Sequence, residues 1–203
     1  HRDHIRGATD FCRRNKARVF AVRRTARALG TECHKRITRV VPERWFEPAD
    51  GVRVLPVPVP HDAPDTVALL VEAGSTRYGH ATDLGAPEGT IRELLTDCDV
   101  LYLEFNYDSE LLASGDYPPM LKRRIASDRG HLGNHQASEL LATLAGPRLR
   151  HVFVAHVSQA NNTADLAVGA ARRALTAWPD VEIELARQER PTATFTAQET
   201  NTR

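Results

Sequence analysis

The chain of 203 residues has few cysteines and no long apolar run. Cys12, Cys33 and Cys98 are widely spaced and odd in number, which excludes a disulfide framework and a CxxC zinc pattern and fits a reducing cytoplasm. No apolar stretch approaches the roughly 18 residues that a membrane-spanning helix needs, and no signal peptide is visible. We therefore expect a cytoplasmic protein without a membrane partner.

Neither positive nor negative charge predominates in the sequence. Lysine and arginine total 27 against 26 acids, so the net charge of +1 favours no particular class of partner. The basic residues are nevertheless locally concentrated, because residues 13–27 in the N-terminal quarter contain seven of them: Arg13, Arg14, Lys16, Arg18, Arg23, Arg24 and Arg27. This concentration mildly favours a polyanionic substrate.

Short apolar runs of strand length alternate with helical stretches, which predicts an α/β layered domain over residues 1–187. Strands are predicted at 17–22, 52–59, 66–72, 77–82, 100–105, 150–157 and 181–186. Helices are predicted at 5–16, 24–29, 87–95, 118–126, 134–144 and 164–178. Pro56 and Pro58 indicate that 52–59 is an edge strand or an extended arm, and Asn134 is a plausible N-cap. Residues 188–203 are polar and predicted to be a disordered tail.

The segment His1-Arg2-Asp3-His4 places two imidazoles and a carboxylate in one tight turn. Further residues of the same kinds follow apolar runs, where strands end: His61, Asp83 and His156. Each of these alone is more often a hydrogen-bonded surface or core residue. Together they favour a metal site, because imidazole suits borderline metals such as Zn²⁺ and a carboxylate can bridge two ions.

The order and spacing of these segments resemble the metallo-β-lactamase superfamily, whose signature is His-x-His-x-Asp-His followed by a His, an Asp and a final His at successive strand ends. Within it, the chain is similar to the YycJ/WalJ-type branch of metal-dependent hydrolases and exonucleases. The matching segments are HRDHIRG at 1–7, PHDAPD at 60–65, ATDLG at 81–85, LEFNYD at 103–108, YPPMLKRRIASDRGHLGN at 117–134 and AHVSQANN at 155–162.

The resemblance implies an αββα sandwich of two mixed sheets, incomplete at the N-terminus, around two divalent ions (Zn²⁺ or Mn²⁺, with Fe²⁺ also possible). His1 and His61 would hold the first ion, Asp3, His4 and His156 the second, and Asp83 would bridge them. The first His of the signature would lie two positions before His1. We expect a chain without the preceding strands to expose apolar surface and to be poorly soluble or metal-deficient.

A second set of residues would contact the substrate: His131, Asn134, Asn106 and Asp108. His131 would also be catalytic, together with Asp3 and Asp83, and Ser158, Asn161 and Asn162 would support the loop that carries His156. The alternative for His131 and Asn134 is a loop group and a helix-cap group. Gly133 and Tyr107 depart from the branch, which usually shows GHLSN and NHD, and the second departure weakens any proton-donor role at position 107.

The sequence predicts a dinuclear metal-dependent hydrolase, most simply a phosphodiesterase that acts on DNA as an exonuclease with a metal-bound hydroxide. The basic residues Lys122, Arg123, Arg124 and Arg129 could grip a phosphate backbone, although a solvated helix face is the commoner explanation. One alternative is a small-molecule esterase, lactonase or cyclic-nucleotide phosphodiesterase; another is a non-catalytic binding module. His34, His80, His135 and His151 match no motif and are predicted to be structural or exposed.

Overall fold

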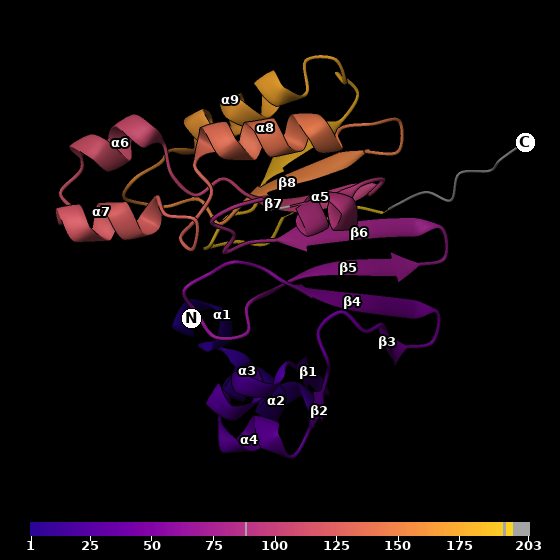
Figure 1. The fold of residues 1–203 in the computed structure, drawn as a ribbon. Coiled ribbons are helices and arrows are strands. Elements are labelled where there is room, and N and C mark those ends of the chain that lie inside the picture. Colours follow the sequence, from indigo (N-terminus) through magenta and orange to yellow (C-terminus); the bar gives the residue numbers. More distant parts are fainter. Residues whose placement is uncertain (88, 193, 197–203) are drawn as a thin grey trace, which may run out of the picture.

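A seven-stranded mixed sheet, ordered β3-β4-β5-β6-β7-β8-β9, is the centre of the computed structural model, which describes residues 1–87, 89–192 and 194–196 (Figure 1). Its strands are β3 (Phe46–Ala49), β4 (Val52–Pro58), β5 (Val67–Ala73), β6 (Thr76–Ala81), β7 (Val100–Glu104), β8 (His151–Ala155) and β9 (Glu182–Leu185). Strands β3 to β6 pair antiparallel, and β6 to β9 pair parallel. The predicted α/β class is confirmed.

Helices cover the parallel half of this sheet. They are α5 (Gly89–Leu95), α8 (Asn134–Leu144) and α9 (Ala164–Ala174), whereas α6 (Ser109–Ser114) and α7 (Pro119–Ile125) lie to one side of the sheet (Figure 1). Helix α8 packs against α5 and α9, and α9 contacts β8 and β9. Strand β7 has parallel neighbours on both sides and buries four of its five residues, as its continuous apolar run predicts.

A smaller unit forms the N-terminal part of the chain and lies beside the antiparallel half of the sheet (Figure 1). It contains α1 (Arg2–Ile5), α2 (Ala8–Asn15), α3 (Arg23–Ala28), α4 (Thr31–His34) and the parallel strands β1 (Val19–Ala21) and β2 (Ile37–Arg39). Its core is separate from the main one and consists of five buried residues: Cys12, Ala21, Ala26, Leu29 and Cys33.

The prediction that 52–59 is an edge strand or an extended arm is wrong, because β4 lies inside the sheet between β3 and β5. The prolines are tolerated for a local reason. β3 pairs only with the Val52–Val54 part of β4, and the carbonyl of Pro56 accepts a bond from the amide of Glu43 on the side away from β5. The nitrogen of Pro56 faces that same side, so the ladder with β5 loses no donor.

Two helix predictions also need correction. The predicted helix 5–16 begins later, as α2 at Ala8 with Gly7 as its N-cap, and residues 2–5 before it form the separate short helix α1. The N-cap of α8 is Gly133, and Asn134 is the first helical residue, with its side chain turned into the protein.

Of the predicted tail, residues 193 and 197–203 lie outside the described residues, and the remainder forms neither helix nor strand. In the described part of the chain, no helix combines the length and the apolar character needed to cross a bilayer.

Candidate metal centre

The polar residues that follow the strands lie at one edge of the sheet. β6, β7 and β8 are parallel, and β4 runs in the same direction because two antiparallel pairings separate it from β6. Their carboxyl ends therefore meet at a single edge, where loops from distant parts of the sequence converge. This topology brings together His61, Asp83, Glu104 and His156.

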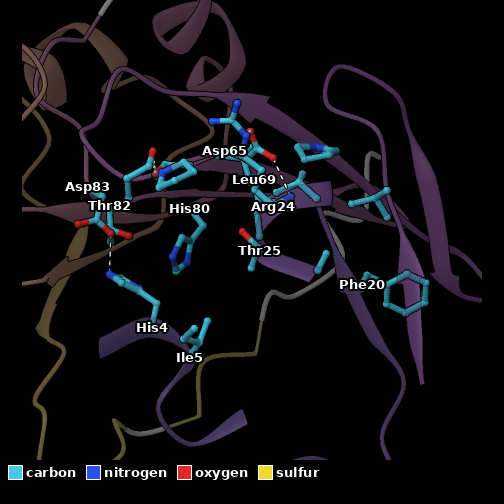
Figure 2. A pocket seen from close by; sticks show the side chains of 18 of the residues that line it. His4, Ile5, Phe20, Arg24, Thr25, Asp65, Leu69, His80, Thr82 and Asp83 are labelled. Carbon is cyan, nitrogen blue, oxygen red and sulfur yellow. Dashed lines mark hydrogen bonds and ion pairs between the residues drawn. The ribbon is translucent and has the colours of Figure 1, made fainter. Parts of the chain in front are cut away.

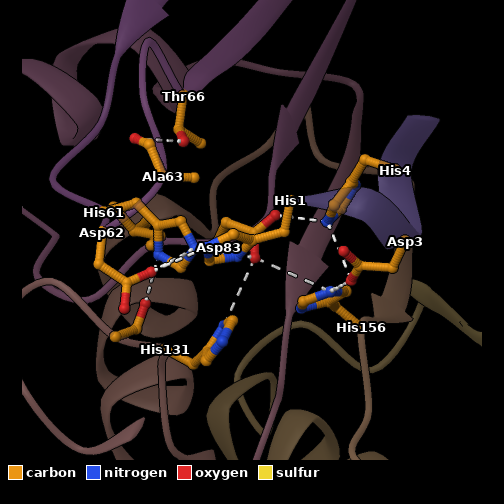
Figure 3. A network of polar contacts seen from close by, with 12 residues as sticks. His1, Asp3, His4, His61, Asp62, Ala63, Thr66, Asp83, His131 and His156 are labelled. Atoms are coloured by element: carbon orange, nitrogen blue, oxygen red, sulfur yellow. Dashed lines mark hydrogen bonds and ion pairs between the residues drawn. The ribbon is translucent and has the colours of Figure 1, made fainter. Parts of the chain in front are cut away.

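Asp83 lies in the middle of this group (Figure 3). Its Oδ2 is 2.6 Å from Nε2 of His4, and its Oδ1 is 3.4 Å from Nε2 of His61. The same Oδ1 lies 3.6 Å from Nδ1 of His131 and 3.9 Å from Nε2 of His156. One carboxylate thus faces imidazoles from four separate segments.

Besides the group that Asp83 forms with Glu104, His131 and His156, two further groups of potential ligands lie on either side of it. In one group, Nδ1 of His1 lies 3.3 Å from Nε2 of His61, and Nε2 of His1 lies 3.2 Å from Oδ1 of Asp62. In the other, Oδ2 of Asp3 lies 3.6 Å from Nε2 of His4 and 3.8 Å from Nε2 of His156. Within each group the potential ligand atoms lie within 4.8 Å of one another, a separation that a single ion could span.

Two of these residues have an unusual backbone conformation. Asp83 has φ 55° and His156 has φ 53°, both in the left-handed region that residues other than glycine seldom adopt. Such conformations cost about 1–3 kcal/mol each and persist where the surrounding structure holds them. At both strand ends, this turn points the side chain toward the shared centre (Figure 3).

Glu104, the last residue of β7, is a site residue that the sequence analysis missed. Its side chain is 0% exposed and accepts hydrogen bonds from Nδ1 of His131 at 2.8 Å and from Nδ1 of His156 at 2.6 Å. It also accepts bonds from the amides of Leu84 and Leu132. An acid inside the apolar run VLYLEF was the available signal, since a buried carboxylate requires partners.

The protein also fixes the ring orientation of two histidines. Nδ1 of His61 lies 2.9 Å from the carbonyl of Gly130, which can only accept, so Nδ1 carries a proton and Nε2 faces Asp83. In the same way, Nδ1 of His156 donates to Glu104 and leaves Nε2 toward Asp3 and Asp83. Metal-binding histidines are commonly oriented by such a bond on the second ring nitrogen.

The charges in this network stabilise one another. Burial opposes ionisation of Asp83, but the hydrogen bond from His4 and the nearby His156 hold the pKa of Asp83 well below its usual range. Burial likewise opposes a charge on His156, yet Glu104 and the two aspartates raise the pKa of His156 to about 9. Burial also works against an ionised Glu104, and its hydrogen bonds from His131 and His156 nonetheless lower its pKa.

Asp62 is the second residue that the sequence analysis missed. It stands next to His61, contacts His1, and forms an ion pair with Arg124 of α7 that lowers the pKa of Asp62. Arg129 donates to the carbonyl of His61 at 3.2 Å. Two members of the predicted basic cluster therefore lie at the rim of the centre, whereas Lys122 is bound to the carbonyl of Ala113.

The other predicted substrate residues have partners inside the protein. Asn106 donates to the carbonyl of His156 at 2.8 Å, and Asp108 caps α6 by accepting from two of its amides. Asn134 exchanges side-chain hydrogen bonds with Asn162, which also donates to the carbonyls of Phe105 and Asn106. These bonds support the loops around the centre, and a substrate role for the three residues stays a prediction.

Support for the His156 loop also comes from Ser158 and Asn161. The amide of Ser158 donates to the carbonyl of Asn106, and its hydroxyl accepts from the amide of Asn161.

The two departures from the branch pattern touch each other. Tyr107 and Gly133 form an isolated β-bridge, and a Cβ built on Gly133 would lie 2.9 Å from two ring carbons of Tyr107. A serine at position 133 would therefore collide with the tyrosine ring. The structure thus links the two departures: Tyr107 fills the space that a side chain at position 133 would need.

A cavity of about 720 Å³ lies between the sheet and the N-terminal unit and reaches the centre at one end (Figure 2). His4 and Asp83 border that end, and most of the lining elsewhere is apolar, for example Phe20, Val54 and Leu69. His80 also lines the cavity and stacks on Tyr102 with 4.6 Å between ring centroids.

The other three histidines that match no motif belong to none of these ligand groups. His151 is buried beside Glu182, and His34 and His135 are exposed.

Residues 1–156 match the family model of the beta-lactamase superfamily domain, so the chain belongs to this superfamily. The chain is 28% identical over 174 residues to exodeoxyribonuclease YycJ of Bacillus anthracis, and 27% identical over 175 residues to exodeoxyribonuclease WalJ of Streptococcus pneumoniae. Each alignment covers 82% of this chain and 64% of the relative, so the chain spans less than two thirds of the length of these relatives. The resemblance stated from the sequence is confirmed.

Comparison with solved structures gives the same fold. The metallo-β-lactamase fold protein YhfI from Bacillus subtilis superposes with a TM-score of 0.57 at 13% identity, over 81% of this chain and 58% of that protein.

Proposed function

We propose that this protein is a dinuclear metal-dependent phosphodiesterase that acts on DNA as an exonuclease. The observation that carries the proposal is the position of Asp83 between two ligand groups, with its two oxygens facing different histidines. A carboxylate in that position suits a bridge between two ions. Superfamily membership supports the coarser part of the proposal, a metal-dependent hydrolase.

The residues present fit two divalent ions. His1 and His61 would hold the first, with Asp62 within reach, and Asp3, His4 and His156 would hold the second. Imidazole nitrogens and carboxylate oxygens without cysteine suit Zn²⁺, Mn²⁺ or Fe²⁺. When bound, such a pair of ions activates water and neutralises charge on the attacked phosphoryl group.

The chain's own residues would do the remaining work. Glu104 holds His131 and His156 in fixed orientations, so that neither imidazole has to reorganise when substrate arrives. Nδ1 of His131 lies 3.6 Å from Asp83, where the imidazole could contact the phosphate or give a proton to the leaving oxygen. The carboxylates of Asp3 and Asp83 would help to hold the two ions in place.

A nucleic-acid substrate is supported by the rim of the centre. Arg124 forms an ion pair with Asp62, and Arg129 donates to the carbonyl of His61. Their positive charges therefore lie in space beside residues of the candidate metal centre. Arginine at such a position can bind phosphate oxygens in a bidentate manner. The relatives YycJ and WalJ are named exodeoxyribonucleases, which agrees with this reading.

The cavity favours a second candidate function, hydrolysis of a small ester or cyclic nucleotide. Its lining is largely apolar, and it opens on His4 and Asp83. An apolar ligand of moderate size would fit such a lining, with its reacting bond beside the ions.

One experiment tests the proposal and separates the candidates. The full-length protein is loaded with Zn²⁺ or Mn²⁺, its metal content is measured, and its activity is assayed on end-labelled DNA, on a cyclic nucleotide and on small esters. Asp83→Asn should abolish binding of the metal pair and reduce DNA cleavage at least 100-fold. Asp97→Asn is the matched control, since Asp97 has the same left-handed conformation (φ 57°) in an exposed turn.

Binding of DNA should weaken steeply with added salt. Fast cleavage of esters with none of DNA would replace the first candidate by the second. Full activity on all substrates in metal-free Asp83→Asn would contradict both.

A further inference from the structure

Cys12 and Cys33 meet in the core of the N-terminal unit. Cys12 lies on α2 and Cys33 on α4, and their side chains are 1% and 0% exposed. Sγ of Cys33 donates to Sγ of Cys12 over 2.8 Å, although 21 positions separate them in the sequence. The spacing in the sequence gives no sign of this pairing, which arises only because α2 and α4 pack together.

The packing holds the two sulfurs at close range. A Cβ built on Gly30, the residue before α4, would lie 2.6 Å from Oγ1 of Thr9, so the absence of a side chain there lets the two helices approach. A disulfide bond is about 2.0 Å long, so closing the remaining gap requires a shift of less than about 1 Å. Small rotations of the two cysteine side chains can supply it.

We propose that Cys12 and Cys33 are an oxidisable thiol pair that forms an intramolecular disulfide. With hydrogen peroxide as the oxidant, the thiolate of one cysteine attacks a peroxide oxygen, which gives a sulfenic acid and releases hydroxide. The second sulfur then attacks the sulfenic sulfur, the S–S bond forms, and a second hydroxide leaves. The two thiol protons convert both hydroxides to water, so the pair has lost two electrons and the peroxide has gained them.

Because Cys12 and Cys33 are buried, only a small oxidant can reach their sulfurs. A small neutral molecule such as peroxide can reach sulfurs that are almost wholly enclosed, whereas a bulky disulfide reagent cannot attack them without opening the unit. The third cysteine provides an internal comparison. Cys98 belongs to the main core and not to the core that contains Cys12 and Cys33, so neither of them lies beside it as a partner for a disulfide.

The bond would add a covalent link to a unit whose hydrophobic core is small. The core of the unit contains five buried residues, and Ile5 of α1 packs against it, one position after His4. Cross-linking α2 to α4 restricts opening of this core. We expect oxidation to make the segment that carries His1, Asp3 and His4 more resistant to local unfolding.

The test uses the intact protein, treated with hydrogen peroxide or with dithiothreitol and digested with trypsin without reduction. Peroxide should link the peptides 7–13 and 28–35, which contain Cys12 and Cys33, with a loss of two hydrogens that dithiothreitol reverses. The linked pair should persist in Cys98→Ala and vanish in Cys12→Ala and Cys33→Ala. Limited proteolysis within residues 1–40 should slow at least threefold in the oxidised form.

Three results would overturn the inference: sulfinic acid at Cys12 or Cys33 without a cross-link, a cross-link that involves Cys98, or equal proteolysis of the oxidised and reduced forms. The peptide map of the wild-type protein is decisive even if a cysteine variant fails to fold. None of these readouts depends on metal or on DNA, so the outcome is independent of the proposed function.

Discussion

The two halves of the candidate metal centre differ in what holds them. His61, Asp83 and Glu104 extend from the main sheet, and their side chains are 1%, 7% and 0% exposed. His1, Asp3 and His4 come from the N-terminal unit, and the side chain of Asp3 is 63% exposed. The first half rests on the large core of the sheet and the helices that cover it, the second on a core of five residues.

From this difference we infer that the sheet half keeps its arrangement without metal, while the N-terminal half depends more on a bound ion. Regions with few buried contacts open locally at low free-energy cost, and a ligand that binds only the closed form stabilises them. We therefore expect changes in the sheet half to lower the stability of the metal-free protein, and changes in the N-terminal half to act mainly on metal binding. Four predictions test this contrast.

The largest effect on stability is expected for Glu104→Ala. Removing the carboxylate leaves the partners of a fully buried ionic network unpaired, which typically costs about 3–5 kcal/mol. Urea unfolding of the metal-free protein measures the change. Asp3→Ala is the corresponding change in the other half, and a loss of stability as large as that of Glu104→Ala would break the comparison.

The next effect concerns His80, which lines the cavity between the two halves. Burial, with a contribution from His4, lowers the pKa of His80 to about 4. The unfolded chain therefore takes up a proton near pH 6.5, whereas the folded protein does so only near pH 4. From this group the free energy of unfolding should fall by up to about 3 kcal/mol as the pH drops through that range, and it should change little below it.

The variant His80→Phe keeps a ring for the stack on Tyr102 and should remove this part of the pH dependence. His135→Phe is the control, because it makes the same exchange at a side chain that is 79% exposed. Unfolding curves at pH 4, 5, 6 and 7 for the three proteins give the comparison. Identical slopes for His80→Phe and wild type would contradict the assignment.

A third prediction concerns the packing of the sheet half. Gly133→Ser should destabilise the protein by about 1–3 kcal/mol, because the new side chain meets the ring of Tyr107. Adding Tyr107→His should recover part of this loss, with a coupling energy of about 1 kcal/mol in a double-mutant cycle. Gly146→Ser is the control, since a Cβ there has nothing within 4 Å. Strict additivity of the two changes would show that they are unrelated.

The smallest effect on stability is expected for Asp3→Asn, which should change the free energy of unfolding by less than about 0.5 kcal/mol because the side chain is exposed. Titration calorimetry with Mn²⁺ should nevertheless show one of two binding steps weakened at least 10-fold and the other nearly unchanged. Equal weakening of both steps would mean that Asp3 does not belong to one ligand group.

Much of the architecture was readable from the sequence, because apolar runs mark strands wherever both faces are buried. The runs at 66–72, 77–82 and 100–105 correspond to β5, β6 and β7 within one or two residues. The prediction for 52–59 was wrong because of its prolines. A proline costs a strand a hydrogen bond only where its nitrogen faces a neighbouring strand. The side that has a neighbour is decided by pairing and not by composition.

By itself the sequence indicated which kinds of side chains gather at the candidate metal centre and that His61, Asp83 and His156 follow strands, since residue type and apolar pattern are local properties. The tertiary structure alone decided how they meet. It put Asp83 between two groups, buried Glu104 against two histidines, set Tyr107 over Gly133, and brought Cys12 to Cys33. Each of these is a contact between segments far apart in the chain, and only packing fixes which segments become neighbours.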